Sequence, residues 1–214
     1  MNKILVMAAH PDDEALGVGG TMLKHIYKGD KVSVCILTKS YAPQWSEKYR
    51  SEALLHQKKF DRLLGVTERI NLDLPTVKLN TLPHGEINKK VSDVIARVKP
   101  DIIYTHHPSD INSDHKITFD SAMVASRPPF KINVFCFETL SETEWGHESF
   151  KPNYYVNIEP FIAKKIKAFS IYKNEIKKFP HPRSPKGVKI LAAKRGSEIC
   201  AKYAEAFTTA RSYW

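Results

Sequence analysis

The chain has 214 residues, of which 42% are hydrophobic and 26% are charged, and its formal net charge is +10. This composition excludes a disordered, collagen-like or coiled-coil chain, and the length suits a single domain, residues 1–214, with a sizeable core. We find no internal repeat, and no apolar run approaches the roughly 20 residues that cross a bilayer, so we expect no membrane span.

The cysteines and the first residues predict a cytoplasmic protein. Cys35, Cys136 and Cys200 are odd in number, widely spaced and in apolar surroundings, as expected for reduced thiols rather than disulfides. The first ten residues lack a small-residue cleavage site and run directly into acidic residues, which argues against a signal peptide. The lysines are scattered, which disfavours nucleic acid as a partner, and an anionic small substrate accounts for the net charge at least as well.

Short apolar runs alternate with amphipathic segments up to residue 138. The apolar runs are rich in β-branched residues and nearly continuous in hydrophobicity, as in strands buried on both faces; they cover residues 3–9, 31–38, 69–74, 101–107 and 132–138. Between them, apolar residues repeat at the helical period in Glu14–Tyr27, Ser46–Leu64, Glu86–Val98 and Asp114–Ala125. This order predicts an α/β fold, a single Rossmann-like domain whose mainly parallel sheet is flanked by helices on both faces.

The alternation is lost after Glu138. Residues 139–153 have the composition of a long loop and residues 154–158 that of a short strand, and we expect two further helices at Pro160–Lys178 and Gly187–Phe207. The glycine-rich run GVGG at residues 17–20 lacks the spacing of a dinucleotide-binding loop, so we interpret it as a site of close helix packing or a kink.

Two polar motifs follow predicted strands, HPDDE at residues 10–14 and HHPSDINSDH at residues 106–115. In open α/β sheets ligands bind beyond the carboxyl ends of the strands, so both motifs should lie on one rim. The acidic residues would suit the first turn of a helix with Pro11 at its first position, but that leaves His10 unexplained. A metal site accounts for it, because His10 and Asp13 plus one further histidine give the three protein ligands of a catalytic zinc ion.

Three histidines are candidates for the third ligand: His106, His107 and His115. A histidine at a strand end is most often a hydrogen-bonded structural residue, and we interpret His106 in that way. His115 follows Asn112 and Asp114, either of which could start a helix that would hold His115 rigidly at the rim. The residues alone leave the choice open.

The stretches AHPDDEALGVGGT and THHPSDINSDH resemble the LmbE-like family of zinc-dependent N-deacetylases, also called the PIG-L family, and the similarity runs over nearly the whole chain. The resemblance implies that His10, Asp13 and His115 bind Zn²⁺ and that Asp12 is the general base. Relatives are often homo-oligomers, commonly hexamers. The later stretches CFETLSETEW, PHPRS and AEAF are similar to a bacterial branch that handles N-acetylated sugars.

The implied reaction removes the N-acetyl group from an amino sugar or sugar conjugate. Zinc would activate water and polarise the amide carbonyl, while Asp12 would take the proton from the water and pass it to the departing amine. Many family members donate to the oxyanion from a histidine three residues before the last ligand, but this chain has Asn112 there. Asn112 could donate a neutral hydrogen bond or only cap a helix, and His106 or His107 could reach in instead. Asp114 is expected to orient site groups rather than bind metal.

Three side chains are candidates for substrate contact. Arg50, in SEKYRSEA, lies roughly where related enzymes have an arginine that grips sugar hydroxyls, although a solvated helix position explains it equally well. Arg127, in ASRPPF, could bind a phosphate or sugar oxygen beside the fifth strand. Trp145 could stack on a pyranose ring or mark a subunit contact.

Two other functions are compatible with the sequence. One is a zinc amidase that acts on a non-sugar amide. The other is a non-catalytic basic binding module that kept the fold, and it predicts no stoichiometric zinc and binding that weakens steeply with salt.

Overall fold

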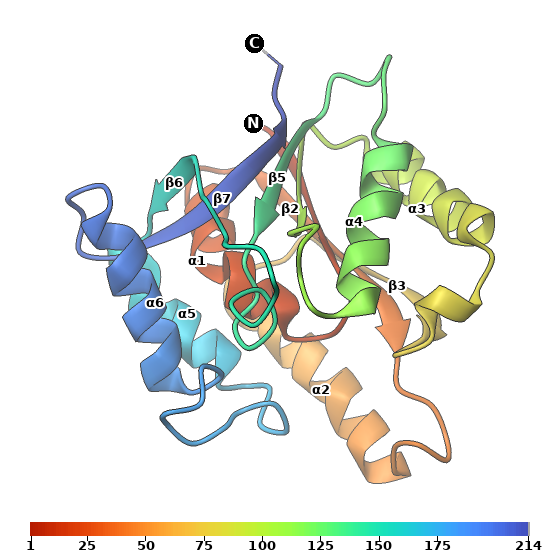
Figure 1. Cartoon of the computed structure of the whole chain (residues 1–214), viewed down its shortest axis with the longest axis horizontal. Helices are drawn as coiled ribbons and strands as arrows, with labels where there is room; N and C mark the ends of the chain where they lie inside the picture. Colours follow the sequence, from red (N-terminus) through yellow and green to blue (C-terminus); the bar gives the residue numbers. More distant parts are fainter. Residues whose placement is uncertain (214) are drawn as a thin grey trace.

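The computed structural model describes residues 1–213, which contain a seven-stranded sheet in the order β3-β2-β1-β4-β5-β7-β6 (Figure 1). Five strands are parallel to one another: β1 (Lys3–Ala8), β2 (Lys31–Lys39), β3 (Glu68–Pro75), β4 (Ile102–His106) and β5 (Asn133–Phe137). Four helices connect them in turn: α1 (Asp13–Tyr27), α2 (Glu47–Leu64), α3 (His84–Val98) and α4 (Ser113–Ala125). The predicted α/β fold with a mainly parallel sheet is confirmed.

The last third of the chain differs from the prediction. It contains β6 (Tyr154–Asn157), α5 (Ile162–Phe169), α6 (Pro185–Ser197) and β7 (Ala204–Arg211). The helix predicted over Pro160–Lys178 therefore ends at Phe169, and the one predicted over Gly187–Phe207 ends at Ser197. Strand β7 is antiparallel to both β5 and β6. Its alanines favour a helix, but the open edge of β5 offers a ladder of backbone partners, and this tertiary pairing outweighs local propensity.

Two apolar layers cover the sheet because successive strand residues point to opposite faces. In β1, Ile4, Val6 and Ala8 face α1, α2, α5 and α6, whereas Leu5 and Met7 face α3 and α4. All five of these side chains are fully buried. Within residues 1–213, no helix combines the length and the apolar character needed to cross a membrane.

Helix α1 packs close to the sheet, which is one of the two interpretations of the glycine-rich run. A Cβ atom at Gly17 would overlap the ring of Phe137, and one at Gly20 would lie 2.7 Å from Cδ1 of Ile158. A buried ion pair of 2.5 Å between Lys165 and Glu205 also holds the helix, because Lys165 Nζ donates to the carbonyl of Leu16 and Glu205 accepts the backbone N–H of Gly20. These contacts fix the helix that begins at Asp13.

We expect Gly17→Ala to destabilise the fold by about 1–3 kcal/mol, because the added methyl group forces Phe137 out of its packed position. Gly85→Ala in α3 is the matched control, since no atom of residues 1–213 beyond its own helix and chain neighbours would lie within 4 Å of its Cβ, and it should change stability by less than about 1 kcal/mol. Urea unfolding measures both. Equal effects of the two substitutions would contradict the close packing of α1.

Candidate metal centre

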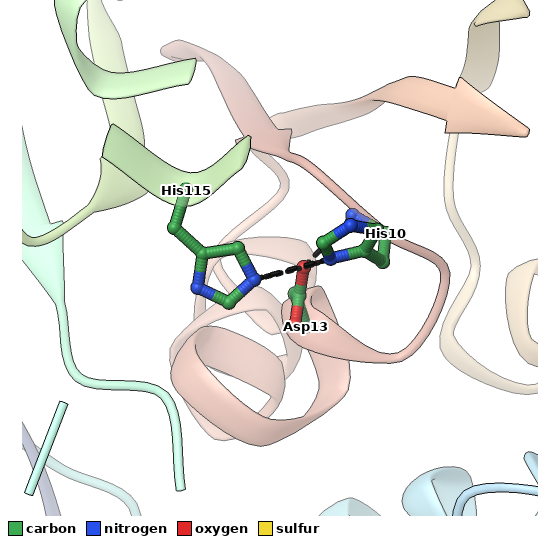
Figure 2. A group of neighbouring side chains, drawn as sticks. All are labelled: His10, Asp13 and His115. Carbon is green, nitrogen blue, oxygen red and sulfur yellow. Dashed lines mark hydrogen bonds and ion pairs between the residues drawn. The ribbon is translucent and has the colours of Figure 1, made fainter. Parts of the chain in front are cut away.

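The two polar motifs meet at the carboxyl ends of β1 and β4, which are neighbours in the sheet. His10 lies in the turn after β1, Asp13 is the first residue of α1, and His115 lies in the first turn of α4. Figure 2 shows the carboxylate of Asp13 between the two imidazole rings. The sequence prediction that these distant segments share one rim is confirmed by this geometry.

Three potential ligand atoms converge there with the spacing of a tetrahedral metal site. Nδ1 of His10 lies 3.1 Å from Nε2 of His115. Oδ2 of Asp13 lies 3.3 Å from the first of these nitrogens and 3.4 Å from the second. Zinc bonds of about 2.0–2.1 Å in tetrahedral geometry separate ligand atoms by about 3.3 Å, so this group could hold such an ion.

The outer nitrogens of the two histidines fix their tautomers. Nε2 of His10 lies 3.0 Å from Oδ2 of Asp114, and Nδ1 of His115 lies 2.9 Å from Oδ2 of Asp110. An ionised carboxylate only accepts hydrogen bonds, so each outer nitrogen carries the proton and each inner nitrogen of the neutral ring presents a lone pair. When both rings are neutral, two lone pairs and the Asp13 oxygen face one another, an arrangement that suits a bound cation.

Acidic neighbours dominate the electrostatics of the cluster, so in the metal-free protein the two histidines hold protons that a bound metal ion would displace. Burial alone would lower the pKa of His115, but Asp13 and Asp110 outweigh it and raise the value to about 10. Asp114 and Asp13 likewise overcome burial at His10 and raise its pKa to about 9. Oδ1 of Asp13 is buried and has no hydrogen-bond partner among residues 1–213. The surplus of negative charge makes the cluster attractive to a cation.

Asp114 and Asn112 support the centre rather than complete it. Besides His10, Asp114 contacts the loop after β3, accepting the backbone N–H of Val77 at 2.6 Å and that of Leu79 at 3.2 Å. Asn112 is the N-cap of α4, and its Oδ1 accepts the N–H of Asp114 at 3.0 Å. Sequence reasoning did not identify Asp110, although an acid five residues before a candidate ligand could have indicated an orienting partner.

His106 and His107 are not part of the group of three ligand atoms, although Nε2 of His106 lies 3.4 Å from Oδ2 of Asp13. Nε2 of His106 accepts the backbone N–H of Ala9 at 2.9 Å, and burial together with His115 lowers the pKa of His106 to about 4. These contacts fit the interpretation of His106 as a hydrogen-bonded residue at a strand end. His107 accepts the N–H of Ser109 and packs edge-on against Phe150. A second cluster of His106, Asp110 and His115 also brings ligand atoms close enough for a metal, and within it Nδ1 of His115 is already hydrogen-bonded to Asp110.

A cavity of about 570 Å³ opens beside His10 and Asp12. Arg50 lines it, as the sequence suggested, and so does Gln57 further along α2. Nε of Arg50 and Oε1 of Gln57 are buried without a hydrogen-bond partner in the described part of the chain. The aromatic residues of the wall include Trp45 and Tyr49, which sequence reasoning did not select.

Asp12 reaches this cavity from a strained backbone. Its φ of 111° lies in the left-handed region, which costs a non-glycine residue about 1–3 kcal/mol. Burial raises the pKa of Asp12 well above its usual value, and Arg183, whose Nη1 lies 3.3 Å from Oδ2 of Asp12, opposes that shift. Ser141 and Glu142 hold the guanidinium at 2.8 and 3.3 Å. Arg183, in the PHPRS stretch, was not among the predicted site residues.

Two predicted substrate contacts lie elsewhere. Arg127 is exposed in the segment between the end of α4 and the start of β5, at the opposite end of the strands from His10. Trp145 is 55% exposed and packs its ring edge-on against His181 at 5.7 Å. Neither belongs to the described residues that line the cavity. Arg127 lies away from the cavity because α4 carries the chain back across the full height of the sheet before Arg127 is reached.

We expect Arg183→Gln to raise the pKa of Asp12, because burial then acts on the carboxylate without an opposing positive charge. The pH titration of the Asp12 carboxyl carbon by ¹³C NMR in metal-free protein should move its midpoint to higher pH. Lys39→Gln is the control, since Lys39 lines the same cavity but pairs with Asp73 at 3.6 Å. A midpoint that stays in place or falls in Arg183→Gln would refute the pairing.

Comparison with known sequences adds a family and relatives. A sequence profile described as GlcNAc-PI de-N-acetylase (PIG-L) matches residues 5–126. The uncharacterized deacetylase YaiS of Escherichia coli K12 is 28% identical over 180 residues, which cover 80% of this chain and 90% of the relative. The diacetylchitobiose deacetylase of Thermococcus kodakarensis is 26% identical over 196 residues, covering 82% of this chain and 70% of the relative.

Solved structures share the fold. The conserved protein TT1542 from Thermus thermophilus superposes with a TM-score of 0.81 at 23% identity and covers 100% of this chain and 97% of its own. GalB, the 4-carboxy-2-hydroxymuconate hydratase from Pseudomonas putida KT2440, has a TM-score of 0.80 at 19% identity, with coverage of 100% and 98%. At these identities the likeness concerns the fold alone, so the reaction must be argued from the site.

Proposed function

The chain belongs to the PIG-L family of GlcNAc-PI de-N-acetylases, and from this premise we propose that it is a zinc-dependent hydrolase that removes the N-acetyl group from an N-acetylated amino sugar or sugar conjugate. The observation that carries the proposal is the juxtaposition of three ligand atoms 3.1–3.4 Å apart with a buried carboxylate, Asp12, that lines a cavity. Two deacetylases among the relatives support this reaction class.

His10, Asp13 and His115 hold the metal in this proposal. A zinc ion bound there supplies Lewis acidity, which lowers the pKa of water and polarises the amide carbonyl. Asp114 and Asp110 keep the two imidazoles in the tautomer and orientation that binding requires. Two neutral ligands and one carboxylate leave the site a net positive charge, which preserves its electrophilic strength.

Asp12 is the general base. It takes the proton from the attacking water molecule and then passes it to the nitrogen of the departing amine. Its burial raises the pKa of the carboxyl group, which makes Asp12 a better proton acceptor than an exposed aspartate. Arg183 opposes this rise in pKa and so favours the ionised form.

Asn112 is the donor to the oxyanion. Its Oδ1 is engaged by the N–H of Asp114, so the Nδ2 amide group is the end that is left to donate into the cavity. His106 cannot take this role, because its two nitrogens already contact Ala9 and Thr139.

The cavity favours a ligand rich in hydroxyl groups. Arg50 offers an unpartnered donor and Gln57 an unpartnered acceptor, and a sugar hydroxyl can satisfy either group. The aromatic ring of Trp45 adds an apolar surface to the same wall. The relative named as a diacetylchitobiose deacetylase supports an N-acetylated sugar as substrate.

We further propose that the protein is cytoplasmic and forms homo-oligomers. Cys35 and Cys136 are free and buried, as suits a reducing compartment. Light scattering of the purified protein tests the oligomeric state directly.

We expect the purified protein to bind about one zinc ion per chain and to release amine from N-acetylhexosamine derivatives, with activity lost on chelation and restored by zinc. The panel should include N-acetylglucosamine, N,N'-diacetylchitobiose and N-acetylated amino acids. Hydrolysis confined to the amino acids would instead indicate an amidase for non-sugar substrates. A chain without bound zinc that binds polyanions in a salt-sensitive manner would indicate the binding module and overturn the proposal.

We expect Asp12→Asn to keep its zinc while turnover falls by about 10²–10⁴-fold, the usual contribution of a general base. His115→Ala should instead lose zinc. Its loss of zinc affinity should exceed the roughly 10- to 100-fold loss expected for Asp110→Asn, which removes only the outer hydrogen-bond partner of His115. Arg127→Ala is the control and should match the unmodified protein. Metal analysis and amine release measure these effects, and full turnover by Asp12→Asn would show that the base is misassigned.

A further inference from the structure

The backbone of Asp12 is held by the side chain of Glu14. The N–H of Asp12 donates to Oε2 of Glu14 at 3.0 Å, and Glu14 is fully buried. We propose that Glu14 is a positioning residue that keeps Asp12 in its left-handed conformation and thereby aims the Asp12 carboxylate at the cavity. The conformational part stands on the geometry alone, and its consequence for turnover rests on the proposed function.

Three hydrogen-bond donors converge on Glu14. Besides the N–H of Asp12 at Oε2, Nη2 of Arg69 donates to Oε1 at 2.9 Å and the hydroxyl of Tyr172 donates to Oε1 at 2.6 Å. A carboxylate suits this position because it accepts at both oxygens and donates nothing. Arg69 balances its charge and also pairs with Asp61 at 2.7 Å. Arg69 of β3 and Tyr172 of the segment after α5 thus hold the Glu14 side chain independently of its contact with Asp12.

As a result, hydrogen bonds hold both the backbone N–H and the backbone carbonyl of Asp12. Its carbonyl accepts the N–H groups of Ala15 at 2.9 Å and Leu16 at 3.0 Å, which starts α1. Its own N–H is turned inward to Glu14 rather than left to solvent. With φ held at 111°, two consecutive aspartates diverge: Asp13 faces the histidines, whereas Asp12 faces Arg183.

The alternative is that Glu14 only stabilises the fold as part of a buried ion pair. The two roles predict different effects when the hydrogen bond to Asp12 alone is weakened. Loss of a stabilising pair lowers the melting temperature and leaves Asp12 in place, whereas loss of the positioning bond lets φ of Asp12 return to the negative values that aspartate prefers.

Glu14→Gln separates these roles because it is nearly isosteric. The amide of glutamine has one acceptor and one donor end, so whichever way it turns, its NH₂ group faces either the Asp12 N–H or the donors of Arg69 and Tyr172. Because Arg69 carries the charge, the oxygen of the introduced amide will turn toward it and the bond to Asp12 will be lost.

Asp61→Asn is the matched control. Asp61 is the other partner of Arg69, is 21% exposed, and contacts neither Asp12 nor the cavity. It weakens the same ion-pair network and lowers the melting temperature without touching the bond between Glu14 and Asp12.

The experiment determines crystal structures of Glu14→Gln and Asp61→Asn and measures kcat, KM and zinc content for each. We expect φ of Asp12 to leave the left-handed region in Glu14→Gln, and kcat per bound zinc to fall about tenfold or more, because small misplacements of a catalytic group are costly. KM and zinc content should stay within about twofold, and Asp61→Asn should keep both φ and kcat. An unchanged φ in Glu14→Gln, or a kcat per bound zinc within about twofold of the parent, overturns the proposal.

A backbone variant serves if Glu14→Gln does not fold. Cys35 allows a synthetic segment 1–34 to be joined to residues 35–214 without a sequence change, so the peptide N–H of Asp12 can be replaced by an ester oxygen while Glu14 stays. The control is the same replacement at Lys3, whose N–H donates to Asp101 at 2.8 Å far from the cavity. Displacement of Asp12 in the first ester and not in the second supports the proposal, and an undisplaced Asp12 in both overturns it.

These readouts separate the two hypotheses. If the parent protein deacetylates no substrate, the proposed function fails, yet the conformation of Asp12 in the variants still decides the role of Glu14. If the parent is active and Asp12 does not move, only the positioning role fails.

Discussion

Two imidazole nitrogens and one carboxylate oxygen lie within 3.4 Å of one another at the rim of the sheet, and this convergence of ligand atoms is the constraint on which the rest of the site depends. With both rings neutral, these three acceptors repel one another, and a cation between them removes that repulsion. Asp110 and Asp114 enforce the arrangement by occupying the outer nitrogens of the histidines. The site therefore favours a bound cation even in the absence of substrate.

Two residues near the site have strained backbone conformations. Asp12 at φ 111° and Val77 at φ 61° both have left-handed backbones, and for a β-branched residue such as Val77 this is rare. Each N–H is held by a carboxylate, Glu14 for Asp12 and Asp114 for Val77. The same kind of contact, a buried acid that grips a backbone N–H, thus supports both sides of the cluster.

The earlier and later parts of the chain make different contributions to the metal centre and the cavity. Residues 5–126, which match the family profile, carry the converging ligand atoms and their outer partners. The later segments supply Arg183 and Tyr172, which contact Asp12 and Glu14 respectively. Variation in this later part of the chain can therefore alter the charge around Asp12 and the shape of the cavity while the converging ligand atoms keep their spacing.

The sequence by itself determined the parallel core of the fold and the meeting of the two polar motifs, because periodicity is local and strand ends in a parallel sheet must share one rim. The residues alone left His106, His107 and His115 open as partners of His10 and Asp13, and only the resemblance to the PIG-L family singled out His115. The sequence did not determine β7, whose alanine-rich segment became a strand only against the open edge of β5. Nor did it identify Arg183, Asp110 or Glu14 as partners of the site, since their roles depend on contacts made across the fold. Only the tertiary structure decided these roles, because the role of a buried charged group depends on the group that it contacts, and no local sequence pattern identifies that partner.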